Sequence, residues 1–274
     1  MLVSAILLFA FFGTFHFKPI MLIKRKSIEH TKSTMRKAKY APVTISEQDG
    51  VRYLHFGTEW VQGAMRLRKP DWLELEYAQQ MMAWMLFIEH PAHIAQLGLG
   101  TGALTKFCYR QFPQAQVRAI ELNPAVITIA NAMFTMPPED ERLCVLEMDA
   151  WDFVNDPANL ESLDVLQSDL YDATARGPVL DSAEFYQACC ACLKPNGILT
   201  VNLFGDHPSY AKNIKAMKFA FAEVLCLPAV HEGNVVAMAF KQKPVLDFVL
   251  LEQRAKEIKL ASKLPANSWV KGLK

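Results

Sequence analysis

The sequence of 274 residues has few of the features that mark a disulfide-rich or metal-binding protein. It contains only six cysteines, and their neighbours are apolar. The one Cys-x-x-Cys motif, from Cys189 to Cys192, has neither a second such motif nor paired histidines to complete a metal site. We therefore expect reduced, buried cysteines, no metal and a cytoplasmic location. Internal repeats and low-complexity tracts are also absent, which argues against a repeat or fibrous protein.

Long hydrophobic runs are missing as well. The apolar run MLVSAILLFAFFGTF at the start of the chain is shorter than the ~20 residues that span a bilayer, and it lacks the basic flank and cleavage site of a signal peptide. Two interpretations remain open. The run is either a weak signal-anchor, with Lys24-Arg25-Lys26 on the cytoplasmic side, or the product of a translation start upstream of Met21 or Met35. In both cases we expect residues 1–38 to be an apolar and basic segment outside the fold, and membrane association is expected only if the run is a signal-anchor.

The net charge of the chain is almost zero, at +1, but its distribution is uneven. Residues 1–39 carry eight basic side chains and one acidic one, and residues 241–274 carry eight and three. The middle, residues 40–240, therefore holds 13 basic and 24 acidic side chains, a net charge of −11. An acidic middle repels nucleic acid and favours a cationic ligand, so we expect no nucleic-acid partner. A solvated acidic surface with no ligand is the alternative.

The pattern of apolar residues indicates an α/β fold. Residues 41–68 alternate around Asp49-Gly50, which predicts a small antiparallel β unit within residues 39–70. A helix with Asp71 as its cap is expected next, over residues 73–89. After Pro91, strands and helices alternate, and this pattern predicts right-handed crossovers and a mostly parallel, Rossmann-type sheet over residues 71–245. The strands are expected at 93–99, 115–122, 142–148, 164–170 and 197–204, with a closing hairpin of 225–230 and 235–240. A C-terminal helix and a basic tail are expected over residues 246–274.

Ligands of an open parallel sheet bind beyond the carboxyl ends of its strands. The first strand of the parallel region ends in Gly98-Leu99-Gly100-Thr101-Gly102. Glycines permit a tight turn and a close approach of the backbone, and the helix that follows offers free N–H groups. The loop therefore predicts a cradle, formed by Gly98, Gly100, Thr101 and Gly102, for an adenosyl-type cofactor. An ordinary turn between a strand and a helix is the alternative.

Acidic residues end the next two strands. Glu121 lies 19 residues beyond Gly102, where a carboxylate can accept hydrogen bonds from both hydroxyls of a ribose. Taken alone, Glu121 could equally be a solvated strand end. Asp149, followed by Ala150, ends the third strand. It could accept a hydrogen bond from an adenine amino group, or it could cap the helix that follows.

The fourth strand ends in Ser168-Asp169-Leu170-Tyr171-Asp172. Two acids three residues apart at the mouth of a strand can converge on one cation and hold an attacking amine in place. Solvent-facing acids in a loop are the alternative.

Together these segments resemble the spermidine synthase family of aminopropyltransferases, over about residues 51–240. The resemblance rests on the order and spacing of the segments, since no single one is specific. They are Val61-Gln62, Tyr77, the GLGTG loop, Ile120-Glu121, Asp149-Ala150, LDVLQSDLYDATARGP, Glu184-Phe185-Tyr186 and the segment from Leu193 to Gly197.

The resemblance implies a class I methyltransferase-like core and an N-terminal β unit that often mediates oligomerisation, hence a possible homodimer. It implies binding of decarboxylated S-adenosylmethionine and of a diamine such as putrescine, without metal. By similarity, Glu121 would hold the ribose and Asp149 the adenine. Gln62 and Tyr77 would hold the cofactor or the amine. Asp169 would act as the base, and Asp172 would bind the substrate next to it.

The sequence departs from the family pattern at several positions. Thr101 stands where the family has an acid, Ala78-Gln79 where it has His-Glu, and Ala173 where it has proline. Thr101 favours a second hypothesis, an S-adenosylmethionine-dependent methyltransferase acting on another small acceptor, whereas Asp169 and Asp172 favour aminopropyl transfer. No Asn/Asp-Pro-Pro-Tyr element follows the fourth strand, which argues against methylation of nucleobase amino groups. A non-catalytic binding protein is the third hypothesis.

Overall fold

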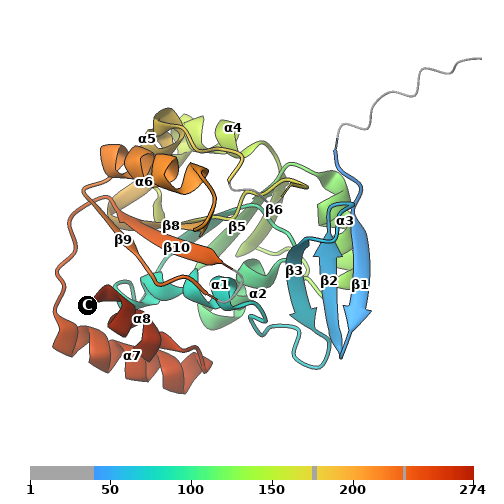
Figure 1. Ribbon diagram of the computed structural model, residues 1–274, viewed down its shortest axis with the longest axis horizontal. Helices are drawn as coiled ribbons and strands as arrows, with labels where there is room; N and C mark the ends of the chain where they lie inside the picture. Colours follow the sequence, from blue (N-terminus) through green and yellow to red (C-terminus); the bar gives the residue numbers. More distant parts are fainter. Residues whose placement is uncertain (1–39, 175–177, 231–232) are drawn as a thin grey trace, which may run out of the picture. The chain divides into compact units, whose positions relative to one another are not determined.

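The computed structural model describes residues 40–174, 178–230 and 233–274, and the predicted segment 1–38 lies outside them (Figure 1). Its first element is an antiparallel sheet of three strands, β1 (Thr44–Gln48), β2 (Val51–His55) and β3 (Val61–Arg66). Asp49 and Gly50 connect β1 to β2 with φ of 52° and 76°, as a two-residue hairpin turn with positive φ requires. The predicted hairpin unit is thus confirmed.

The second sheet has seven strands in the order β6-β5-β4-β7-β8-β10-β9. Five of them are parallel, and β10 runs antiparallel between β8 and β9. This arrangement confirms the prediction of a mostly parallel α/β sheet. The chain reverses its direction of winding between β4 and β7, so the topological switch point lies at their carboxyl ends. The strands are β4 (His93–Leu97), β5 (Gln116–Glu121), β6 (Leu143–Glu147), β7 (Leu163–Ser168), β8 (Leu193–Phe204), β9 (Glu223–Cys226) and β10 (Asn234–Phe240).

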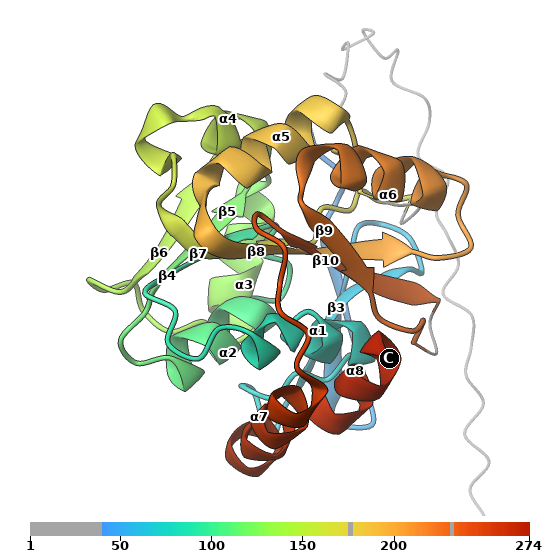
Figure 2. The ribbon, with the colours of Figure 1, turned by 90° about the vertical axis from the view of Figure 1, so that its left-hand side faces the viewer.

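Helices cover both faces of this sheet (Figures 1 and 2). One layer consists of α4 (Ala150–Asn155), α5 (Ala183–Cys192) and α6 (Ser209–Ala220); the other contains α2 (Ala103–Gln111), α3 (Pro124–Met133), α7 (Phe248–Ser262) and α8 (Ala266–Leu273). Successive strand residues face opposite layers, as Ile94 and Ala95 do in β4. The strands are therefore apolar on both sides, as parallel strands between two helical layers must be.

The predicted helix over residues 73–89 is wrong in length. The chain forms a short α1 (Glu76–Gln80) and a 3₁₀ turn, Ala83–Leu86, and Leu73 and Leu75 precede both. Residues 81–86 are buried on every side, so their apolar spacing does not mark one face of a helix. Asp71 is not its cap, because its carboxylate pairs with Arg110 at 2.8 Å.

The C-terminal region contains one more helix than the sequence predicts. α7 is capped by Asp247, whose carboxylate accepts the N–H groups of Val249 and Leu250. The expected basic tail forms α8, whose Trp269 and Val270 are buried against the core. None of the helices in the described part of the chain is long and apolar enough to cross a membrane.

Candidate functional site

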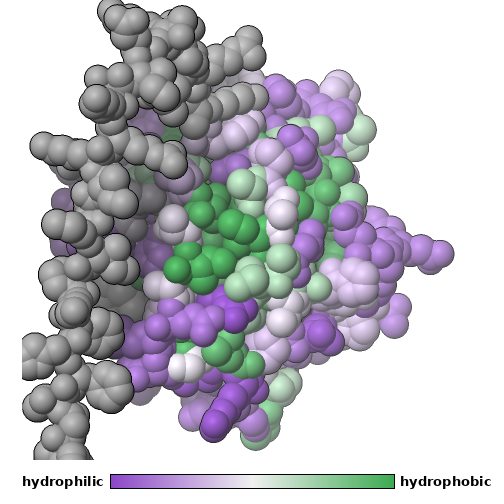
Figure 3. All heavy atoms as spheres, turned by 90° about the vertical axis from the view of Figure 1, so that its right-hand side faces the viewer, coloured by the Kyte–Doolittle hydropathy of each residue, from purple (hydrophilic) through white to green (hydrophobic). Residues whose placement is uncertain are grey.

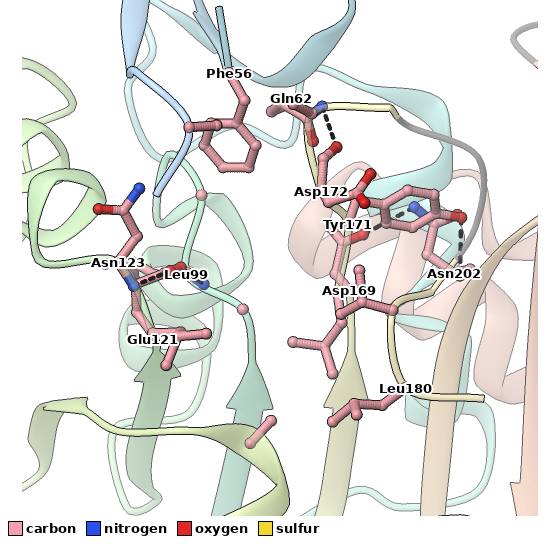
Figure 4. Close-up of a pocket in the computed structure, with 18 of the residues that line it drawn as sticks. Phe56, Gln62, Leu99, Glu121, Asn123, Asp169, Tyr171, Asp172, Leu180 and Asn202 are labelled. Atoms are coloured by element: carbon pink, nitrogen blue, oxygen red, sulfur yellow. Dashed lines mark hydrogen bonds between the residues drawn. The ribbon is translucent and has the colours of Figure 1, made fainter. Parts of the chain in front are cut away.

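A cavity of about 700 Å³ opens at the carboxyl ends of β4, β5, β6, β7 and β8, beside the three-stranded sheet (Figure 4). Nine residues singled out in the sequence line it: Gln62, Tyr77, Gly98, Gly100, Glu121, Asp149, Ala150, Asp169 and Asp172. They come from β3, β5, α1, α4 and the loops after β4, β6 and β7, so the fold brings together segments that lie more than a hundred residues apart. The cavity coincides with the switch point, where the topology predicts a ligand.

The glycine loop supplies the floor between β4 and α2. Gly98, Gly100 and Gly102 all have positive φ, a backbone conformation that residues other than glycine rarely adopt. A Cβ on Gly98 would lie 2.4 Å from the carbonyl oxygen of Asp169. Glycine at this position therefore lets the end of β4 approach the end of β7, and the candidate base lies directly beside the loop.

Glu121 is bound to that loop through its carboxylate. Oε2 accepts the N–H of Leu99 at 3.0 Å, and Oε1 accepts the N–H of Asn123 at 2.9 Å (Figure 4). Burial raises the pKa of Glu121, and the backbone N–H groups oppose that rise. Each oxygen has a second lone pair, so the carboxylate can still accept two hydroxyl groups from the cavity.

Asp149 caps α4 through Oδ1, which accepts the N–H of Trp151 at 2.8 Å. Asp149 and Ala150 also line the cavity. The two interpretations of Asp149 are therefore compatible, because capping engages one carboxylate oxygen and leaves Oδ2 for a donor in the cavity.

Asp169 has a half-buried carboxylate that is held by two side chains. Its Oδ1 accepts the side-chain N–H of Asn202 at 2.9 Å, and its Oδ2 accepts the hydroxyl of Tyr77 at 3.2 Å. Burial raises the pKa of Asp169, while the two hydrogen bonds lower it. A buried carboxylate with few partners takes up a proton more readily than an exposed one, which suits a general base.

Asp172 is exposed, and its side chain is turned towards its own loop. Oδ1 accepts the N–H of Thr174 at 2.8 Å and the hydroxyl of Thr174 at 2.6 Å. The carbonyl oxygen of Asp172 accepts the side-chain N–H of Gln62 at 3.2 Å (Figure 4). This hydrogen bond joins the loop after β7 to the three-stranded sheet above the cavity. Part of the loop, residues 175–177, lies outside the described residues.

Thr101 and Gly102 do not line this cavity. The side chain of Thr101 is 2% exposed and packs against Gly63, where an added Cβ would lie 2.8 Å from it. Gly102 faces the sulfur of Met136. Thr101 instead lines a neighbouring space of about 30 Å³ together with Glu74, and Arg66 holds the carboxylate of Glu74 through two hydrogen bonds.

Comparison with known proteins identifies the family of the chain. The sequence model of a family described as "Spermine/spermidine synthase domain" matches residues 74–248. The chain belongs to the spermine/spermidine synthase family. A polyamine aminopropyltransferase of Chromobacterium violaceum is 34% identical over 234 residues, which are 85% of this chain and 89% of that relative. One of Neisseria meningitidis is 32% identical over 250 residues, 89% of this chain and 94% of that relative.

The fold of the spermine/spermidine synthase family is seen in solved structures too. The crystal structure of a probable spermidine synthase from Corynebacterium glutamicum matches with a TM-score of 0.67 at 18% identity, covering 87% of this chain and 94% of that one. The relatives named above are transferases, and this chain is a spermidine synthase-like transferase with a methyltransferase-like fold.

Three polar residues of the site were missed in the sequence. Asn202 and Asn234 lie near the carboxyl end of β8 and at the start of β10, and Tyr171 donates its hydroxyl to the carbonyl oxygen of Asn202 at 3.1 Å. An asparagine in the otherwise apolar segment GILTVNLF was the available signal for Asn202. Asn234 follows a turn and gave no such signal.

The cysteines are free, and Cys189 and Cys192 lie on α5 with their side chains buried in the core. Burial raises the pKa of the Cys189 thiol, so it is protonated and unreactive at neutral pH. Within the described residues, no group of three or more His, Cys, Asp or Glu side chains could hold a metal ion.

Proposed function

We propose that this protein transfers the aminopropyl group of decarboxylated S-adenosylmethionine to a diamine such as putrescine. The observation that carries the proposal is the half-buried carboxylate of Asp169, placed between the glycine loop and the amide of Asn202. Membership of the spermine/spermidine synthase family supports it, because relatives that cover most of this chain are named polyamine aminopropyltransferases.

The cavity suits an adenosyl group. Glu121 offers two oxygens for the ribose hydroxyls, and Asp149 offers one for the adenine amino group. Leu122, Met148 and Leu180 also line the cavity and supply apolar surface for a base. The sulfonium group of the donor would supply an activated carbon. The residues of this chain would position the two reactants and accept the proton of the amine.

Asp169 acts as the base in this scheme. A primary amine has an ordinary pKa of about 10.4 and is mostly protonated at neutral pH, so it cannot attack until it loses a proton. Asp169 accepts that proton, the amine nitrogen forms a bond to the carbon next to sulfur, and the carbon–sulfur bond breaks with its electron pair left on sulfur. Tyr77 and Asn202 hold the carboxylate in position. Placing both reactants in one cavity provides much of the remaining acceleration.

The test is an incubation of the purified protein with putrescine and either decarboxylated or intact S-adenosylmethionine, followed by mass spectrometry. We expect methylthioadenosine and spermidine from the decarboxylated donor. Asp169→Asn should reduce turnover by at least 10²-fold and leave nucleoside affinity within about threefold. Asp49→Asn is the matched control, because Asp49 is exposed at the tip of the β1–β2 hairpin and asparagine tolerates its positive φ. Normal turnover by the Asp169→Asn protein would remove Asp169 from its role.

A methyltransferase is the second candidate, and Thr101 is the observation that favours it. With threonine on the loop, the small space beside Tyr77 is lined by two carboxylates, those of Asp169 and Glu74, and Arg66 already neutralises Glu74. S-adenosylhomocysteine formed from intact S-adenosylmethionine would support this candidate. If neither donor gives a product or a thermal shift, both proposals fail.

We also propose a homodimer that forms through the three-stranded sheet, in the cytoplasm. Apolar side chains gather in the middle of the face that carries this sheet (Figure 3). Val61 on β3, Leu67 directly after β3 and Met133 on α3 are exposed apolar residues. Multi-angle light scattering should give a mass near twice 30.9 kDa. A monomeric mass across micromolar concentrations would contradict the dimer.

A further inference from the structure

A second asparagine stands behind the one that contacts Asp169. Asn234 donates its side-chain N–H to Oδ1 of Asn202 at 2.9 Å, and Asn202 donates its own side-chain N–H to Oδ1 of Asp169 at 2.9 Å. β8 and β10 are antiparallel, with Asn202 opposite Val236. Asn234 lies two residues from Val236, so its side chain projects from the same face of the sheet as that of Asn202.

The side-chain amide of Asn202 can point in two directions. An ionised carboxylate only accepts hydrogen bonds, so it requires the NH₂ group of Asn202 on its side. The amide oxygen of Asn202 then faces away and needs a donor of its own. Asn202 is 3% exposed, so bulk water does not supply that donor, and Asn234 does. If the amide of Asn202 turned round, its oxygen would face Asp169 and favour the protonated carboxyl group.

We propose that Asn234 is a positioning residue: it holds the amide of Asn202 with its NH₂ group towards Asp169 and so keeps Asp169 in the form that accepts a proton. The inference rests on the proposed function, in which Asp169 is the base. Asn234 itself need not touch the substrate. Its effect reaches the reaction through Asn202.

The other groups around Asp169 leave this role to the two asparagines. From α1, Tyr77 donates to Oδ2, the other oxygen. On the loop of Asp169 itself, the hydroxyl of Tyr171 is engaged with the carbonyl oxygen of Asn202, and Asp172 is bound to Thr174. From the loop after β4, the neighbour is Gly98, which has no ionisable group. Among the described residues, Asn202 is thus the donor to Oδ1, and its orientation bears directly on the charge of Asp169.

The test compares Asn234→Asp, Asn234→Ala, Asn202→Ala and the double variant Asn202→Ala/Asn234→Asp. An aspartate at position 234 can only accept, so the amide of Asn202 must turn its NH₂ group towards it and its oxygen towards Asp169. With decarboxylated S-adenosylmethionine and putrescine, we expect the acid limb of kcat/KM to move up by about one pH unit, with KM for the donor changed less than twofold. Asn234→Ala should move it by about half as much, because it removes the donor without adding an acceptor.

The double variant separates the amide relay from a simple effect of charge. With alanine at position 202, a carboxylate at position 234 has no amide to turn. The shift of the acid limb between Asn202→Ala and the double variant should therefore be less than a third of the shift between the wild type and Asn234→Asp. Asn196→Asp is the matched control, because Asn196 is exposed at the opposite end of β8 and the variant carries the same added charge. Its pH profile should equal that of the wild type.

Three outcomes would overturn the inference. They are an unshifted acid limb in both single variants of Asn234, a shift of full size in the double variant, or an equal shift in Asn196→Asp. A readout without turnover keeps the inference separate from the proposed function: the carboxyl carbon of Asp169, labelled with ¹³C and assigned with Asp169→Asn, should titrate at higher pH in Asn234→Asp than in the wild type. A wild type that makes no product refutes the proposed function, whereas an unchanged titration refutes the role of Asn234.

Discussion

Lys106 is a buried cation whose cost to the fold can be measured. It lies on α2 with no exposed surface, and its Nζ donates to the carbonyl oxygen of Phe134 at 2.7 Å and to the sulfur of Met65 at 3.3 Å. Both partners are uncharged. Burial lowers the pKa of Lys106 to about 8, with Asp71 opposing the change. In the unfolded chain, the same group has a pKa of about 10.4.

The sign of the effect follows from proton binding. Between pH 8 and about 10.4, the unfolded chain keeps the proton on Lys106 and the folded chain has released it, so stability rises with pH in this window. Below pH 8 the folded state carries the whole penalty, about 3 kcal/mol for this difference in pKa. Lys106→Met removes the penalty. The free energy of unfolding of the variant relative to the wild type should therefore fall by about 3 kcal/mol from pH 7 to pH 10.5.

The assay is urea unfolding of both proteins at several pH values between 7 and 10.5. Comparing the two proteins cancels the other titrating groups and the pH-independent loss of the hydrogen bond to Phe134. Lys215→Met, an exposed lysine of α6, should show a relative stability that does not change with pH. A difference between Lys106→Met and the wild type that stays constant within 1 kcal/mol would refute the reasoning.

Three further substitutions test the site. Gly98→Ala should cost about 2–4 kcal/mol of stability in thermal unfolding and lower turnover at least tenfold, because the added Cβ meets the carbonyl oxygen of Asp169. The control is Gly50→Ala, where φ is also positive but no atom lies near the added Cβ; it should cost about 1 kcal/mol and keep full turnover. Glu121→Gln should weaken binding of methylthioadenosine about tenfold or more in calorimetry, and unchanged affinity would rule out Glu121 as the ribose acceptor. Tyr77→Phe should shift the acid limb of the pH profile upwards, because the pKa of Asp169 loses one of the two hydrogen bonds that lower it.

Most of the fold could be predicted because its signals are local. The alternation of strands and helices after Pro91 and the Asp49-Gly50 turn each depend on residues close together in the chain. The region over residues 73–89 could not be predicted in the same way. Its carbonyl groups find partners in distant elements: Gln167 donates to the carbonyl of Met81, and Arg254 donates to that of Met85. These bonds let the chain leave the helical path inside the core.

The candidate site divides in the same way. The sequence by itself determined that a glycine loop and the carboxylates of Glu121, Asp149 and Asp169 would meet at one edge, because the carboxyl ends of parallel strands share that edge. Only the tertiary structure decided that Thr101 packs against Gly63 instead of facing the cavity. It also decided that Asn234 stands behind Asn202. Both outcomes depend on which strands become neighbours across long stretches of chain, and no spacing in the sequence carries that information.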